Sequence, residues 1–153
     1  MEQTYEILLQ QFSALIEGEH NKMSVLANTA ALLKQTFPER FFWVGFYLVE
    51  DGRLELGPFQ GTVACYHIEK GRGVCGTAWA ERRTVLVPDV EQFPGHIACS
   101  SLSRSEIVVP LIGEQQQVAG VLDIDSTEVG TFNATDQHYL EEIAKILVRA
   151  LGY

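Results

Sequence analysis

Several features that would point to a particular compartment or partner are missing from this sequence. The chain has 11 Lys and Arg against 20 Asp and Glu, a formal net charge of −9. This shortage of positive charge argues against nucleic acid, whose phosphates attract Lys and Arg, and against an anionic membrane surface. No apolar run reaches the ~20 residues that a membrane-spanning helix needs, and the first residues, MEQT, do not begin a secretory leader. We therefore expect a soluble, cytoplasmic protein.

Motifs for a metal or a nucleotide are also lacking. There is no Cys-x-x-Cys pair, and His67 and His96 do not have metal-ligand spacing to the cysteines. Residues 71–76, GRGVCG, are rich in Gly but lack the Gly-Lys-Ser/Thr ending of a phosphate-binding loop, so turn formation explains them better. We therefore expect no metal and no cofactor.

What the sequence does have is three cysteines, Cys65, Cys75 and Cys99, in its middle third. A reducing compartment keeps thiols free, and an odd number does not suit a purely structural set of disulfides, so we interpret them as redox-active. Cys99 lies in a loop near His96 and Arg104, which could favour a thiolate. Cys75 precedes an expected short helix, whose N-terminus would lower the pKa of the thiol. The alternative for Cys75 is a small buried hydrophobic residue. Any two of the three could pair.

The hydrophobic pattern changes along the chain from helical to strand-like and back. It predicts helices over 4–17, 22–36 and from 135 onward, a short helix over 77–81, and strands over 41–49, 54–59, 64–68, 84–87, 105–112 and 117–125. Asp51-Gly52 predicts a tight hairpin. We expect one domain over residues 1–153 with an α+β fold: a central antiparallel sheet with N- and C-terminal helices on one face and a ligand pocket on the other. The two terminal helices leave room for a homodimer.

Strand alternation predicts which side chains face that pocket. Trp43 and Tyr47 share one face of the first strand, and later strands place Glu106, Asp123 and Asp125 opposite the helix layer. Carboxyl groups placed side by side repel, so one of them can hold its proton more tightly than in water. An aromatic wall and an acidic wall suit a small ligand that carries an ammonium group. The alternative for Asp123 and Asp125 is a solvent-facing or turn-capping role.

Several motifs together resemble the free methionine-(R)-sulfoxide reductases, which are single GAF domains that reduce the free amino acid. Residues 70–78 (KGRGVCGTA) followed by 84–90 (TVLVPDV) are similar to the central signature of GAF domains. More specific to the reductases are the spacing of the three cysteines and the segments 42–47 (FWVGFY), 57–61 (GPFQG), 96–99 (HIAC), 103–106 (SRSE) and 120–126 (GVLDIDS). The resemblance covers nearly the whole chain and implies a GAF-like fold.

The resemblance implies a separate role for each cysteine. Cys99 matches the catalytic cysteine, Cys65 matches its usual resolving partner, and Cys75 matches a third, auxiliary cysteine. The implied reaction is reduction of free methionine-(R)-sulfoxide through a sulfenic acid on Cys99 and a disulfide with Cys65. An external dithiol, thioredoxin, would restore the thiols by exchange.

The resemblance also implies which residues bind the substrate. Trp43 and Tyr47 would border the methyl group, and Glu106, Asp123 and Asp125 would bind the sulfoxide and the ammonium. One of these carboxyl groups, with Glu106 among the candidates, would donate a proton to the sulfoxide oxygen. The long loop over residues 91–103 could close the pocket and favour the free amino acid over a methionine inside a protein.

Two interpretations from other classes stay open at this stage. A GAF domain could bind a small ligand without catalysis and signal by dimerising. The cysteines could also form a redox switch that reports oxidation and turns over nothing. An assay for methionine production from the free sulfoxide separates both from an enzyme.

Overall fold

The computed structural model of the chain describes residues 1–153 except Ala98. Its helices are α1 (Glu2–Ile16), α2 (Lys22–Thr36), α3 (Gly73–Glu81) and α4 (Ala134–Leu151), with a short 3-10 helix, η1 (Val90–Gln92). Its strands are β1 (Trp43–Glu50), β2 (Arg53–Gln60), β3 (His67–Ile68), β4 (Val85–Val87), β5 (Ser105–Ile112) and β6 (Val118–Ser126). Within the described residues, no helix has the length and apolar character to cross a membrane.

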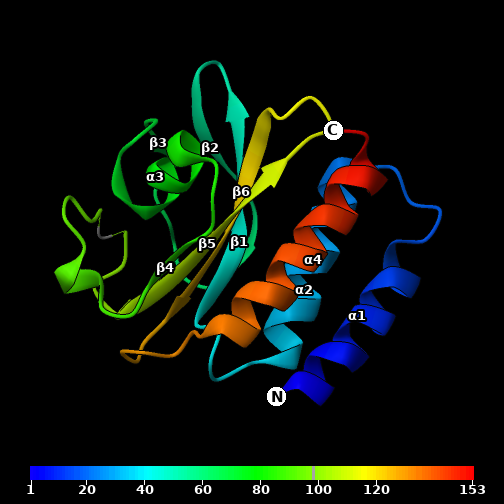
Figure 1. Ribbon diagram of the computed structural model, residues 1–153, viewed down its shortest axis with the longest axis horizontal. Coiled ribbons are helices and arrows are strands. Elements are labelled where there is room, and N and C mark those ends of the chain that lie inside the picture. The colour runs from blue at the N-terminus through cyan, green and yellow to red at the C-terminus, as the bar shows by residue number, and fades with distance from the viewer. Residues whose placement is uncertain (98) are drawn as a thin grey trace.

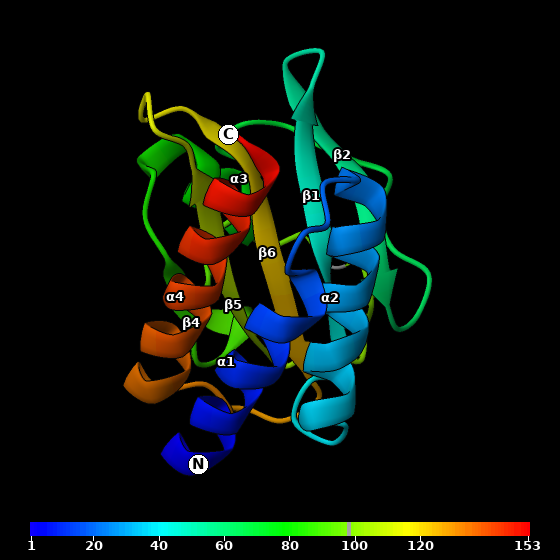
Figure 2. The same ribbon diagram turned by 90° about the vertical axis from the view of Figure 1, so that its right-hand side faces the viewer.

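The six strands form one antiparallel sheet in the order β3-β2-β1-β6-β5-β4. Figures 1 and 2 show α1, α2 and α4 on one face of this sheet, while α3 lies on the other face. Strands β1 and β6 occupy the centre, so their side chains on the α3 face are the best placed to line a site. The α+β fold predicted from the sequence, with its N- and C-terminal helices on one face, is confirmed.

Local sequence signals explain how several elements begin and end. Asn21 caps α2, because its side chain accepts a hydrogen bond of 3.1 Å from the backbone N–H of Ser24. Asp51 and Gly52 join β1 to β2 with φ angles of 52° and 79°. Positive φ at both central residues is typical of the two-residue hairpin turn that matches strand twist. The predicted hairpin is confirmed.

The two faces of the sheet bury two separate hydrophobic clusters, which follow the strand alternation. On the helix face, Val44 and Phe46 pack with the apolar sides of α1, α2 and α4. On the α3 face, Trp43 and Tyr47 pack with Val108 and with residues of α3. Phe42 packs on the α3 side beside Trp43 because it precedes β1 and does not follow the alternation of that strand.

Two predicted elements differ in the structure. The helix predicted over 77–81 begins earlier, at Gly73, so Cys75 lies within its first turn rather than before it. Its glycines serve close packing: a Cβ on Gly76 would lie 2.4 Å from the carbonyl oxygen of Glu69. The strand predicted over 64–68 is reduced to His67–Ile68, because the preceding residues leave the sheet and carry Cys65 toward Cys99.

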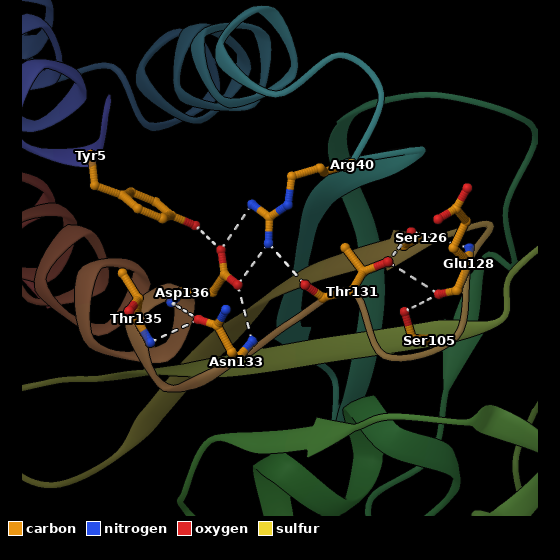
Figure 3. Close-up of polar contacts among 9 residues, drawn as sticks. All are labelled: Tyr5, Arg40, Ser105, Ser126, Glu128, Thr131, Asn133, Thr135 and Asp136. Carbon is orange, nitrogen blue, oxygen red and sulfur yellow. Dashed lines mark hydrogen bonds and ion pairs between the residues drawn. The ribbon is translucent and has the colours of Figure 1, made fainter. Parts of the chain in front are cut away.

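A buried ion pair joins the helix layer to the chain that leads into β1 (Figure 3). Asp136, fully buried at the start of α4, accepts hydrogen bonds from Arg40 on both carboxylate oxygens, at 3.0 and 2.8 Å. The Tyr5 hydroxyl of α1 donates a further hydrogen bond of 2.5 Å to Asp136. Asp136 also completes a capping box with Asn133. The buried charge is thereby paired and hydrogen-bonded, as burial of a carboxylate requires.

The loop between β6 and α4 is fastened to the ends of both neighbouring strands (Figure 3). Ser105, at the start of β5, donates a hydrogen bond of 2.6 Å to the carbonyl of Glu128. The hydroxyls of Ser126, at the end of β6, and Thr131 lie 2.7 Å apart. These contacts fix the strand ends beside Glu106 and Asp125, the residues next to the two serines.

Candidate active site

Three of the predicted site residues form one row across the sheet. Trp43 on β1 is paired with Asp125 on β6, and Asp125 is paired with Glu106 on β5. The next row on the same face contains Gly45, Asp123 and Val108. Because side chains alternate, Asp123 and Asp125 point the same way, toward α3. The register alone therefore brings all three carboxyl groups together.

A cavity lies over these rows, on the α3 face of the sheet. It encloses about 540 Å³ of space, a volume that includes open solvent. The predicted site residues that line it are Trp43, Tyr47, Cys75, Cys99, Glu106, Asp123 and Asp125. Among the described residues, Cys65 is the predicted site residue outside this lining. The sequence thus predicted the pocket-facing side chains of the sheet correctly.

In the acidic wall, Glu106 and Asp123 are buried and Asp125 is half-buried. Glu106 and Asp123 each expose 6% of their surface. Burial, followed by the charges of its acidic neighbours, raises the pKa of each of Glu106, Asp123 and Asp125 well above the ordinary value. Among the described residues, Asp123 Oδ1 has no hydrogen-bond partner. The raised pKa values favour the protonated form of these carboxyl groups, which can donate a hydrogen bond, whereas a bound cation would favour their ionisation.

A hydrogen bond and a ring contact fix Trp43 in the aromatic wall. The Trp43 indole N–H donates a hydrogen bond of 2.9 Å to the carbonyl of Thr62, and its ring stacks on Phe59 with centroids 5.1 Å apart. Gly45 leaves room for this ring, since a Cβ there would lie 2.8 Å from Trp43 and 2.3 Å from Phe59 Cβ. The Tyr47 ring lies 6.1 Å from that of Trp43. The wall is a preformed apolar surface facing the carboxyl groups.

A disulfide joins Cys65 to Cys99, which are 34 positions apart in sequence and have their Cα atoms 5.5 Å apart. The residues alone left this pairing open, and the resemblance implied it. The Tyr47 hydroxyl donates a hydrogen bond of 2.9 Å to the carbonyl of Cys65. Both cysteines are partly exposed. The disulfide thus borders the cavity on the side of Cys99 and remains open to solvent.

Cys75 is a free thiol with 4% exposure, and it lines the cavity beside the acidic wall. Burial and the charge of Asp123 raise the pKa of its thiol well above the ordinary value. The lowered pKa expected from a helix N-terminus is therefore wrong, because burial and negative neighbours outweigh the helix dipole. Ligand atoms of Cys75, Glu106 and Asp123 lie within 4.8 Å of one another, a spacing that suits a cation.

His96 lies at the site, but beside Glu106 rather than as a positive charge that favours a Cys99 thiolate. Its Nε2 lies 3.7 Å from Glu106 Oε1, and burial lowers the pKa of the imidazole. A neutral His96 supplies no positive charge to stabilise a Cys99 thiolate. Arg104 is exposed and lies outside the described cavity lining. His67 lies at the surface of β3, as expected, and pairs with Glu55.

Sequence reasoning missed several contributors to the site, among them Phe59, Thr62 and Ser103. Phe59 and Thr62 contact Trp43, and Thr62 and Ser103 line the cavity. A hydrogen bond from Ser103 opposes the rise in the pKa of Asp125. The signal for Ser103 was its place in the SRSE segment of 103–106. Phe59 carried a similar signal in the GPFQG segment of 57–61, but its contact with Trp43 depends on the β1–β2 register.

Comparisons with known proteins agree with this fold and site. The family model described as "GAF domain" matches residues 24–151. The chain therefore belongs to the GAF domain family.

Its relatives narrow this assignment. The chain is 48% identical to the "Free methionine-R-sulfoxide reductase" of Escherichia coli, over 97% of this chain and 88% of that protein. It is 56% identical to "GAF domain-containing protein A" of Dictyostelium discoideum, over 95% of this chain and 91% of the relative. A solved structure of the free methionine-R-sulfoxide reductase from Neisseria meningitidis, in complex with its substrate, superposes with a TM-score of 0.93 at 51% identity, covering 97% and 88% of the two chains. Within the GAF family, the chain groups with the free methionine-R-sulfoxide reductases.

Proposed function

We propose that this protein reduces free L-methionine-(R)-sulfoxide to L-methionine, with Cys99 as the nucleophile and Cys65 as the resolving cysteine. One observation carries the proposal: a disulfide that includes Cys99 borders a cavity walled by buried carboxyl groups on one side and aromatic rings on the other. The reductase relatives named above support the choice of substrate.

Substrate binding follows from the two walls. The methyl group of the sulfoxide packs against Trp43, with Tyr47 beside it. The ammonium binds within the acidic wall, where Asp123 Oδ1 lacks a partner among the described residues. A bound cation favours ionisation of the nearest carboxyl group, while another keeps its proton because like charges oppose a second ionisation. The pocket thereby holds one carboxylate for the ammonium and one acid for the sulfoxide oxygen.

The chemistry begins when the Cys99 thiolate attacks the sulfur of the sulfoxide. A protonated carboxyl group, from Glu106 or from the Asp123/Asp125 pair, transfers its proton to the sulfoxide oxygen. The hydroxyl oxygen then bonds to Cys99 Sγ as the S–O bond and the new S–S bond break, so methionine departs and Cys99 is left as a sulfenic acid. The Cys65 thiol then condenses with this group, releasing water and forming the disulfide. An external dithiol reopens the disulfide with two electrons and two protons, one proton for Cys65 and one for the carboxyl group, and becomes a disulfide itself.

Cys75 is assigned an auxiliary role, because its buried position favours the thiol over the thiolate. We propose thioredoxin as the external dithiol and a reducing compartment, the cytoplasm, as the site of the cycle. No metal or organic cofactor enters these steps. The single-domain organisation and the homodimer expected from the sequence stay predictions.

The deciding experiment offers the reduced protein free methionine-(R)-sulfoxide with dithiothreitol and measures methionine. We expect turnover of the free R epimer, and little or none of the S epimer or of a peptide-bound sulfoxide. Cys99→Ser should abolish turnover and retain sulfoxide binding, whereas Cys65→Ser should complete one turnover and then recycle slowly. Cys75→Ser is the matched control. Absence of methionine with the unaltered protein would favour a sensor or a redox switch.

A further inference from the structure

Exposed apolar side chains surround the disulfide on its solvent side. They are Val63, Tyr66, Ile97 and Leu102, which expose 87%, 74%, 36% and 57% of their surface. Val63 and Tyr66 flank Cys65, while Ile97 and Leu102 flank Cys99, so the disulfide itself gathers them into one region. We call these four residues the disulfide rim. Isolated exposed apolar residues are normal, but a group of them around a reactive bond indicates an interaction surface.

The two segments that carry the rim also lack charge. Neither residues 61–66 (GTVACY) nor residues 97–103 (IACSSLS) contain a charged side chain, in a chain that is 20% charged with a net charge of −9. An uncharged patch on an acidic protein avoids electrostatic repulsion of an approaching acidic partner. It also presents nothing that a small charged thiol would need. These features fit a partner protein whose own surface is apolar and uncharged around its reactive cysteine.

The position of the two sulfur atoms indicates which one an incoming thiolate attacks. Thiol–disulfide exchange proceeds in line, with the nucleophile approaching opposite the leaving sulfur. Cys99 lines the cavity, and Cys65 lies outside the described lining. Attack on Cys99 would therefore come from the enclosed, acidic side, whereas attack on Cys65 comes from the side of the rim. Cys99 then leaves as a thiolate directly into the substrate pocket.

We propose that the disulfide rim is the docking surface for a protein dithiol whose thiolate attacks Cys65. This proposal rests on the proposed function for the origin of the disulfide. In the first exchange, the partner's sulfur bonds to Cys65, the Cys65–Cys99 bond breaks, and Cys99 takes the electron pair. The partner's second thiolate then attacks its own mixed-disulfide sulfur, releasing Cys65 as a thiolate and leaving the partner oxidised.

The kinetic test compares two reductants on one variant. Tyr66→Asp/Leu102→Asp alters the two rim residues that do not line the cavity, and Ile7→Asp/Met23→Asp alters two exposed apolar residues on α1 and α2 as a matched control. With thioredoxin as reductant, we expect the rim variant to raise the KM for thioredoxin about tenfold or more, as loss of a central apolar contact does. Turnover with dithiothreitol, and both activities of the control, should match the unaltered protein. An unchanged KM for thioredoxin in the rim variant would overturn the proposal.

A trapping test works even if the protein does not reduce methionine sulfoxide. A thioredoxin whose second active-site cysteine is replaced by Ser is mixed with the oxidised protein, and free thiols are then alkylated. We expect mass spectrometry to find the mixed disulfide on Cys65 and the alkyl group on Cys99, with a lower yield from the rim variant. A mixed disulfide on Cys99 would contradict the assignment. If the rim variant changed the sedimentation of this protein alone and left the yield of trapped mixed disulfide unchanged, the rim would be an interface with a second copy of the chain. That result would also overturn the proposal.

Discussion

The Tyr47 hydroxyl donates a hydrogen bond to the backbone carbonyl of Cys65, 2.9 Å away. This contact links the aromatic wall of the pocket to the segment that carries the proposed resolving cysteine. Tyr47 is almost fully buried, with 2% exposure, and burial raises the pKa of its hydroxyl, so the group stays a donor throughout the physiological range. One side chain therefore shapes the substrate pocket and positions half of the disulfide.

Removing this hydroxyl should slow disulfide formation more than sulfoxide reduction. A hydrogen bond of this kind contributes about 1 kcal/mol, so we expect Tyr47→Phe to slow closure of the disulfide about fivefold. The measurement is single-turnover kinetics, with methionine release and loss of free thiols followed separately. Tyr139→Phe, which removes a hydroxyl on the helix side of the sheet, is the control. Equal slowing of both steps would show that Tyr47 acts on the substrate instead.

The acidic wall should make the protein less stable as pH rises. The folded-state pKa values of Glu106, Asp123 and Asp125 are raised above their unfolded values, so the native state binds protons more tightly. The stability that this supplies is fully present below the unfolded pKa, near 4, and is lost as pH rises through the raised values. We expect the free energy of unfolding to fall by up to about 1.4 kcal/mol per pH unit for each group involved.

Urea unfolding of the reduced protein at pH 5 and pH 8 measures this slope. Glu106→Gln should flatten it and raise stability at pH 8, because a neutral amide does not oppose burial as a carboxylate does. Glu19→Gln, at an exposed position, should follow the unaltered protein. A Glu106→Gln variant with the full slope would show that this residue does not contribute to the coupled titration.

Amide variants of the three carboxyl groups should change different kinetic constants, according to the role of each group. Replacing the proton donor by its amide should lower kcat about 10²–10⁴-fold, the usual contribution of a general acid. Replacing a group that binds only the ammonium should raise KM instead. We therefore expect Glu106→Gln, Asp123→Asn and Asp125→Asn to differ in which constant changes. The rate with the unaltered protein should fall as pH rises through the raised pKa of the donor, and that fall should disappear in the donor's amide variant.

The buried pair between Arg40 and Asp136 should be important for stability and not for chemistry. Removing one partner leaves a buried charge without compensation, which costs about 3–5 kcal/mol. We expect Arg40→Leu to lower the free energy of unfolding by an amount in that range, while Tyr5→Phe, which removes one hydrogen bond, costs about 1 kcal/mol. Denaturant unfolding provides both values. If Arg40→Leu lowered the free energy of unfolding no more than Tyr5→Phe does, the ion pair would not be important for stability.

The sequence predicted the sheet side of the site well, because strand alternation is a local rule. Once β1, β5 and β6 were assigned, the facing of Trp43, Tyr47, Glu106, Asp123 and Asp125 followed without knowledge of the tertiary structure. Which of these side chains are neighbours depends on the register between strands. That they share one face of the sheet depends only on alternation within each strand. The helix α2 and the strand β5 were also predicted with the bounds that the structure has.

What could not be predicted depends on contacts between distant segments. The Cys65–Cys99 pairing needs two loops to meet, and nothing in either loop specifies the other. The start of α3 was misplaced because Gly73 and Gly76 were interpreted as turn residues, whereas Gly76 is required where the helix passes the carbonyl of Glu69. The pKa of Cys75 was expected to move the wrong way, since the carboxyl groups around it come from other strands.

Formation and reduction of the disulfide also change the conformational entropy of the unfolded chain during each reaction cycle. Its 34-residue span contains β3, α3 and β4, so the oxidised protein has a closed loop that the reduced protein lacks. By the loop-closure relation, such a loop destabilises the unfolded state by about 4 kcal/mol. The loop includes both edge strands of the sheet, β3 and β4, and each turnover would raise and then lower the free energy of unfolding by this amount. The melting temperature of a working sample would report what fraction of the molecules await reduction.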